Sequence, residues 1–458
     1  MKSTELEHSI KIMAALLKQA PGMLDTARRN PTFPDIERIA VASIANADSL
    51  SEALEAYDDY FGLVPDWKFL FASTTGATPG LSMHRTFSDG SVVRGLFATG
   101  AVILLDPVTR QDMEAGREAI VPIDYSISLD SQALSYLAPY LQGITSGIPD
   151  DFHEIFSFVS NDHVFVDAIP YMLENLPNIL VKENVDRIRR RLAGYERLRT
   201  IDASHFHATG EVRSVASEAE ERRSVDDLLT RMISDASDRE LMELLRSRHA
   251  CLYAVLLKMV TIQLRNPQRA LASKIEEFME FLDKTMQTIH ARETIVAAEY
   301  FTKGQKLNFF GKIHKSPAKR LPELLDALKN MAWDFLHIRH VEGASVIEGA
   351  VSQVARSSPR YFFPSLLTCD KDFVEVIDLY PLKSYAYRKE SHQLVPFPAM
   401  DWMSEVAGGS GRETEFRHRF YSDEAVERRD NMREGVFENI HEIVHRLETE
   451  FLKIAVNS

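Results

Sequence analysis

Two strand-like runs of the sequence end in carboxylates. The run 119–130, AIVPIDYSISLD, alternates apolar residues and closes on Asp130, after which a helical pattern begins at once. The run 364–373, PSLLTCDKDF, passes from an apolar stretch into Asp370 and Asp372. Acids at the carboxyl ends of neighbouring parallel strands converge in one crevice. Because Mg²⁺ prefers hard oxygen ligands, these acids are candidate ligands of a divalent cation.

Two further acids lie in segments with helical periodicity. Glu174 stands in IPYMLENLPN and Asp334 in MAWDFLHIRH. Along the chain the order is a strand ending in Asp, a helical Glu, a helical Asp, and a strand followed by Thr-x-Asp. A site that holds a metal and activates water needs a few such converging carboxylates.

Each acid also has a simpler explanation. An Asp directly after a strand often caps the next helix, and Asp130 is well placed to do so. Asp334 could instead pair with Arg339 on the same helix. Glu183 and Glu299 compete with Glu174 for the part of the second acid.

The order and context of these acids resemble the PIN domain, a family of metal-dependent nucleases. ISLDSQALSYL resembles its first-strand motif, in which an Asp precedes a small hydroxyl residue, and LLTCDKDF is similar to its later Thr-x-Asp-x-Asp-Phe strand. The likeness covers roughly residues 119 to 200 and 320 to 385, less than half of the chain. It implies a three-layer α/β/α (Rossmannoid) parallel sheet.

The resemblance also implies roles for the residues. Asp130 and Asp370 would bind Mg²⁺ or Mn²⁺ directly or through water, and Glu174 and Asp334 would complete the site and orient the attacking water. The substrate would be single-stranded RNA. Residues expected to support these groups are Asp372, Ser131 and Thr368.

Two other functions stay open. The same fold could have lost its metal and serve as a nucleic-acid or protein interaction module, with a long helical hairpin as the docking surface. It could also be a nucleotide phosphohydrolase. A small closed pocket would favour the phosphohydrolase, and an open cationic groove would favour RNA.

The chain departs from a compact PIN-like domain in the distance between its second and third acids. The stretch between Glu174 and Asp334 is far longer than such a domain needs, so a large helical insertion is expected, with one helix ending at Asn266-Pro267 and the next running to about residue 301. The SDGS segment at 88–91 predicts a β-hairpin within an N-terminal mixed α+β extension. The expected divisions are 1–115 for the extension, 116–200 and 302–400 for the two parts of the PIN-like domain, 201–301 for the insertion, and 401–458 for a linker and C-terminal helix.

Basic residues gather in two places that could meet a phosphate backbone. The segment 302–320 contains no acid, and its Phe309 and Phe310 could stack on bases if the loop is open. Arginines also recur in the helical segment 187–199. The alternative for both segments is a solvated surface. The cations expected to bind RNA in the first segment are Lys303, Lys306, Lys312, Lys315, Lys319 and Arg320.

The overall composition sets further limits. The 458 residues carry a net charge of −14, which argues against a broadly basic coat for nucleic acid but not against a local groove. The two cysteines, Cys251 and Cys369, have no metal-binding spacing and suit a reducing cytoplasm. No apolar stretch is long enough to predict a membrane span, and the helical segments could support a homo-oligomer.

Overall fold

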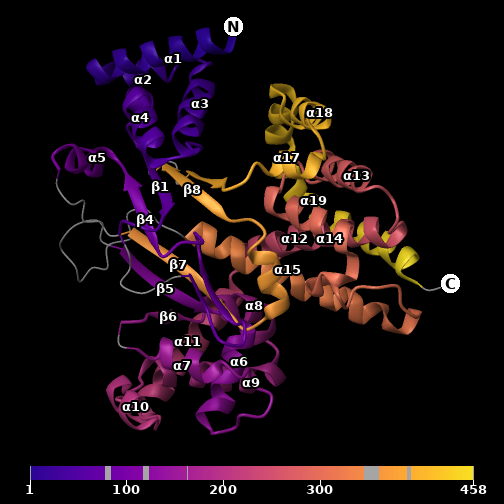
Figure 1. The fold of residues 1–458 in the computed structure, drawn as a ribbon. Coiled ribbons are helices and arrows are strands. Elements are labelled where there is room, and N and C mark those ends of the chain that lie inside the picture. Colours follow the sequence, from indigo (N-terminus) through magenta and orange to yellow (C-terminus); the bar gives the residue numbers. More distant parts are fainter. Residues whose placement is uncertain are drawn as a thin grey trace.

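The protein is a mixed α/β molecule, seen here in a computed structural model that is 66% helical and contains two β-sheets (Figure 1). The α/β class predicted from the sequence is therefore confirmed. The buried apolar side chains form two large clusters. One joins most of the strands and helices after residue 70, and the other lies under the N-terminal helices. The structure describes residues 2–77, 84–116, 123–161, 163–344, 361–388 and 393–456.

The sheet that carries the predicted acids has the strand order β2-β3-β7-β5-β6. β5 pairs in parallel with both β6 and β7, whereas β3 pairs antiparallel with β7 and β2. The sheet is therefore mixed, which corrects the expected wholly parallel sheet. The antiparallel edge is the hairpin that SDGS predicts, with Gly90 at φ +94° in its turn. The strands are β2 (His84–Thr86), β3 (Val92–Gly95), β5 (Ile123–Leu129), β6 (Val166–Asp167) and β7 (Tyr361–Thr368).

β5 and β7 lie side by side at the centre of this sheet. β7 is buried along almost its whole length, as expected for a strand covered on both faces. Leu129 of β5 pairs with Leu367 of β7, so the two strands end at the same level. This register brings the residues that follow each strand, Asp130 and Asp370, to one edge.

The second sheet is antiparallel and has the order β4-β1-β8-β9. It joins strands from both ends of the predicted PIN-like region, because β1 pairs with β4 on one side and with β8 on the other. Strands β1 and β4 of the N-terminal extension therefore share a sheet with residues 382–398, whereas its β2–β3 hairpin belongs to the first sheet. The strands are β1 (Trp67–Ser73), β4 (Ala101–Leu105), β8 (Leu382–Arg388) and β9 (Gln393–Pro398).

N-terminal helices pack on this second sheet around their own core, which includes Ile10, Ile44 and Phe69 (Figure 1). Their apolar residues recur with helical spacing, as in Phe33–Ala45, where the buried side chains share one face. These elements are α1 (Lys2–Gln19), η1 (Pro21–Met23), α2 (Leu24–Ala27), α3 (Phe33–Ala45), α4 (Leu50–Tyr60), η2 (Phe61–Leu63) and, after β4, α5 (Pro107–Glu114).

Helices α6, α7, α9, α10 and α11 lie below β5 and β6 in Figure 1, and α6 and α8 contact β5. α6 begins directly after Asp130, and α9 packs against α6. Their bounds are α6 (Ser131–Leu141), α7 (Phe152–Val159), α8 (Ile169–Ile179), α9 (Lys182–Arg199), α10 (Ala203–Thr209) and α11 (Glu218–Ser237).

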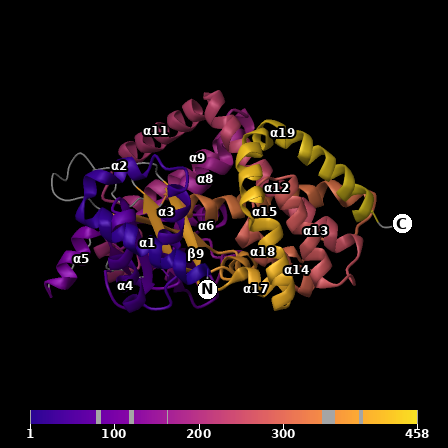
Figure 2. The same ribbon diagram turned by 90° about the horizontal axis from the view of Figure 1, so that it is seen from above.

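The remaining helices surround α12, which is buried on most of its faces and packs against α15 and α19 (Figure 2). The break predicted at Asn266-Pro267 is confirmed by the end of α12, but the helix expected to run to 301 is two helices, separated near Gln287, whose φ is +51°. The bounds are α12 (Arg239–Arg265), α13 (Leu271–Lys284), α14 (Ala291–Lys303), η3 (Gly304–Lys306), η4 (Asn308–Phe310), η5 (Ala318–Arg320), α15 (Leu321–Ala344), α16 (Lys371–Ile377), α17 (Trp402–Ala407), α18 (Ser410–Tyr421) and α19 (Asp423–Ala455).

Two expected boundaries are adjusted by these elements. The linker expected within 401–458 is reduced to Gly408 and Gly409, between the end of α17 at Ala407 and the start of α18 at Ser410. Helices of the predicted insertion, 201–301, belong to the same hydrophobic cluster as the first sheet and α15. Within the described ranges, no helix is long and apolar enough to cross a membrane.

Candidate functional site

The four predicted acids line a single cavity of about 330 Å³. It opens beyond the carboxyl ends of β5 and β7, where α6 and α16 begin and α8 and α15 pass. Four separate segments of the chain thus contribute one carboxylate each. Two of the predicted supporting residues, Ser131 and Asp372, also line it.

Asp130 combines the helix-capping role with a place in the cavity. Its Oδ1 accepts a hydrogen bond of 2.5 Å from the backbone N–H of Ala133, which caps α6. Its own N–H donates to the carbonyl oxygen of Leu367 on β7, at 3.1 Å. Burial, supported by the charges of Asp370 and Glu174, raises the pKa of Asp130 to about 7 despite hydrogen bonds from Thr368 and Ala133. Asp130 can therefore cap α6 and at the same time serve as a ligand in the cavity.

Asp370 is the N-cap of α16. Its Oδ1 accepts from the backbone N–H groups of Asp372 and Phe373 at 3.0 and 3.1 Å, and both of these bonds go to the same oxygen. The fully buried Thr368 lies between the two caps, because its Oγ1 accepts from the Asp370 N–H at 3.0 Å and its hydroxyl also bonds Asp130. Thr368 therefore fixes the two acids relative to one another.

Glu174 reaches the cavity from α8. The Ser131 hydroxyl at the start of α6 donates a hydrogen bond to its Oε2. Burial raises the pKa of Glu174, and the Ser131 hydrogen bond and the positive charges of Arg191 and Arg187 on α9 act in the opposite direction. Ser131 thus links the second acid to the first, since it follows Asp130 directly.

Asp334 projects from the middle of α15, not from a helix start. Its pKa lies well above the ordinary value, first because of burial and then because of the neighbouring charges of Asp370, Asp130 and Glu174. The alternative pairing with Arg339 is wrong. That guanidinium binds Glu293, with a shortest contact of 2.6 Å, and Glu342 at 3.0 Å.

The donor set fits a hard divalent cation. All four groups are carboxylates, and burial, followed by mutual repulsion, raises the pKa of Asp130 and Asp334. Among the described residues, no three His, Cys, Asp or Glu side chains stand close enough to form a ready coordination shell. The arrangement is a ring of acids around a cavity, and Mg²⁺ commonly binds in such places through retained water molecules.

The predicted basic residues meet this cavity only in part. Of the six cations in 302–320, only Lys312 is among the residues that line it. Lys303 pairs with Glu299 and Arg320 with Glu323. Phe310 is fully buried, which corrects the expectation that it stacks on bases, whereas the largely buried Phe309 lines the cavity.

Several lining residues were not predicted. Asn330 and His337 lie four residues before and three residues after Asp334, so helical spacing places them on the same face of α15. That spacing alone could have identified them. Asn308 comes from η4, and nothing in its local sequence indicates a place beside the acids.

Comparisons with models of protein families, with curated proteins and with solved structures give no match to this chain. We therefore infer its function from the acidic cavity itself. The PIN-like resemblance of the two strand motifs remains an interpretation of the sequence.

Proposed function

We propose that the chain is a metal-dependent ribonuclease with a PIN-like three-layer core, which hydrolyses RNA phosphodiester bonds. The observation that supports this most is the meeting of Asp130, Glu174, Asp334 and Asp370 around one cavity. Carboxylates gathered in a partly desolvated cavity repel one another at a cost to the fold, and groups with such perturbed pKa values cluster at functional sites.

The four acids have distinct parts in this proposal. Asp130 and Asp370 hold Mg²⁺ or Mn²⁺, since Thr368 fixes both of them at the ends of adjacent strands. Such an ion, when bound, lowers the pKa of an attacking water and stabilises charge on the leaving oxygen. Glu174 and Asp334 orient the water by accepting its hydrogen bonds.

Three basic side chains near the acids would bind the phosphates of the substrate. Lys312 lines the cavity, and Arg187 and Arg191 are close enough to Glu174 to affect its pKa. These side chains would hold the phosphates on either side of the bond that is cut.

The central test uses purified protein, Mn²⁺ and a labelled single-stranded RNA. Asp130→Asn and Asp370→Asn should each reduce cleavage by at least about 10³-fold, and because Asn is a good N-cap both variants should keep their circular dichroism spectrum. Asp238→Asn, the same change at the N-cap of α12, is the matched control and should cleave normally. Undiminished cleavage by either cavity variant would contradict the mechanism.

Hydrolysis of a nucleotide phosphate is the second candidate. The modest size of the cavity and its single lysine favour it, because a long RNA groove usually carries more cations. Incubating the protein with Mn²⁺ and nucleoside mono-, di- and triphosphates distinguishes the two. Phosphate release without RNA cleavage would assign the site to this second function.

A further inference from the structure

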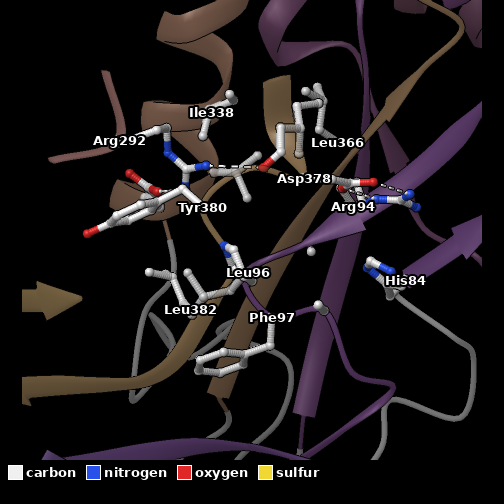
Figure 3. Close-up of a pocket in the computed structure, with 16 residues that line it drawn as sticks. His84, Arg94, Leu96, Phe97, Arg292, Ile338, Leu366, Asp378, Tyr380 and Leu382 are labelled. Carbon is white, nitrogen blue, oxygen red and sulfur yellow. Dashed lines mark hydrogen bonds and ion pairs between the residues drawn. The ribbon is translucent and has the colours of Figure 1, made fainter. Parts of the chain in front are cut away.

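A second cavity, of about 360 Å³, lies where β3, β7 and the start of β8 meet α14 and α15 (Figure 3). It is separate from the acidic cavity, and no residue lines both. A cavity of this size suits a small organic molecule. Its apolar lining includes Leu96, Phe97, Ile338, Leu366, Tyr380 and Leu382.

Arg94, one of the two guanidinium groups in this wall, is fully occupied. Its Nε and Nη2 donate to the two oxygens of Asp378 at 2.7 and 2.9 Å, and its Nη1 donates to the carbonyl of Arg85 at 2.9 Å. Asp378 in turn uses both oxygens for Arg94 (Figure 3). This pair therefore closes one side of the cavity and has little to offer a ligand.

Arg292, the other guanidinium, is buried and incompletely bonded. It donates to Glu342 at 2.5 Å and to the Ile377 carbonyl at a long 3.4 Å, and its Nε has no hydrogen-bond partner among the residues that the structure describes. A guanidinium has five N–H donors, so Arg292 keeps several unused. Its planar group lies over the ring of Tyr380, 5.0 Å from the centroid.

The acceptors of the cavity are already engaged. Glu342 gives one oxygen to Arg292 and the other to Arg339, at 3.0 Å, and Asp378 is bound by Arg94. Each of these carboxylates is already paired with a guanidinium, so a ligand cation would have to compete with an existing ion pair. The cavity therefore offers a ligand the N–H donors of Arg292. A guanidinium forms its strongest hydrogen bonds with a negatively charged oxygen.

We propose that this cavity binds a small aromatic acid. Its ring packs among Phe97, Ile338 and Leu382, and its carboxylate or sulfonate accepts hydrogen bonds from Arg292. Burial of the ring supplies most of the affinity, and the guanidinium selects the anion. This site stands independently of the ribonuclease proposal.

Isothermal titration of the full chain with three matched probes tests the assignment: 1-naphthoic acid, 1-naphthalenemethanol and 1-naphthylmethylamine. The acid should bind one site per chain at least 10-fold more tightly than the alcohol, and the amine most weakly. Equal affinities for the three, or no measurable binding of any, would overturn the proposal.

Two variants locate the binding. Leu96→Trp fills the cavity and should weaken 1-naphthoic acid at least 10-fold, whereas Leu180→Trp, on the exposed end of α8, should not. Arg292→Gln should reduce the affinity for the acid to that for the alcohol. If Arg292→Gln fails to fold, Leu96→Trp decides, and unchanged binding there places the ligand elsewhere. Asp130→Asn should leave the affinity unchanged, which excludes the acidic cavity as the binding place.

Discussion

Buried carboxylates of this protein fall into two chemically different groups. Asp130 and Asp334 lie among other acids, and burial and repulsion raise their pKa values. Glu293 is more deeply buried than either, yet Arg339 and His290 hold its pKa below the ordinary value against the effect of burial. A buried carboxylate thus lowers the stability of the fold when it lies among other acids and raises it when an arginine is its partner.

This contrast predicts opposite effects of one chemical change. Asp334→Asn removes a carboxylate whose charged form is disfavoured by burial and by the neighbouring acids, so in metal-free buffer the free energy of unfolding should rise measurably. Glu293→Gln leaves Arg339 with only one of its two carboxylate partners, Glu342, and should lower the free energy of unfolding by about 3 kcal/mol. Urea denaturation in the presence of EDTA measures both. A destabilised Asp334→Asn protein would show that this acid is a structural group.

Lys312 and Lys319 form a second matched pair, because both are exposed but only Lys312 lines the acidic cavity. Lys312→Ala should raise the KM for RNA about 5-fold to 10-fold with a smaller change in kcat, since it removes a phosphate contact away from the reacting bond. Lys319→Ala should change neither constant. Steady-state kinetics at a fixed salt concentration checks this, and equal effects of the two changes would remove the assigned role of Lys312.

Sequence reasoning succeeded at this scale where a residue's position along an element determines its direction. Asp130 and Asp370 follow paired strands, and the strand register alone brings them to one edge. The lysines of 302–320 were predicted as a group because the sequence records their charge but not their orientation. The burial of Leu307, Phe309 and Phe310 turns most of that segment's cations away from the acids.

At the scale of elements, a charge cluster joins α12 to α13. Glu277 of α13 binds Lys258 and Arg265 of α12, both at 2.9 Å, and Arg269 of the connecting turn at 2.5 Å. Partial burial on its own would raise the pKa of Glu277, but Lys258, Arg269 and Arg265 outweigh it and lower the pKa to about 2. Unfolding restores a pKa near 4.5.

Glu277 should therefore make stability depend on pH. Because its folded pKa is depressed, its contribution is complete above about pH 5 and is lost as the pH falls towards 2. Glu277→Gln should lower the free energy of unfolding at pH 7 and have progressively less effect towards pH 3. Urea titrations of both proteins across this range provide the measurement, and a pH-independent difference would contradict the assignment.

The elements themselves were predictable to different degrees. The β2–β3 hairpin and the end of α12 follow from local turn residues, which act over a few positions. The division of residues 67–105 between two sheets did not follow, because β1 takes β8 as its second partner from the far end of the chain. The alternation of apolar and polar residues in a strand does not indicate which distant strand it will pair with.

At the scale of the whole molecule, α12 belongs to the core and not to a detachable lobe. Its apolar residues pack against α15, which carries Asp334, and against α19. The expected insertion, 201–301, lies within this shared core. The net charge of −14 makes separate copies of the protein repel one another. Self-association through the helices stays a prediction.

Removal of residues 201–301 should therefore prevent folding, although the PIN-like resemblance lies entirely outside them. The deletion exposes the apolar faces of α15 and α19 that α12 covers, a loss far larger than the net stability of a typical domain. Near-ultraviolet circular dichroism and thermal unfolding of the shortened chain check this. A cooperative transition in that chain would show that 201–301 is an independent unit.

The acids of the cavity come from widely separated stretches of the chain, the first at position 130 and the last at position 370. During synthesis the ribosome releases Asp130 and Glu174 long before β7 and Asp370 have emerged. A growing polypeptide still attached to the ribosome therefore lacks the complete set, and the proposed nuclease activity could arise only after Asp370 has been synthesised. If the protein is a nuclease as proposed, the incomplete chain could not cut the messenger RNA from which it is being translated.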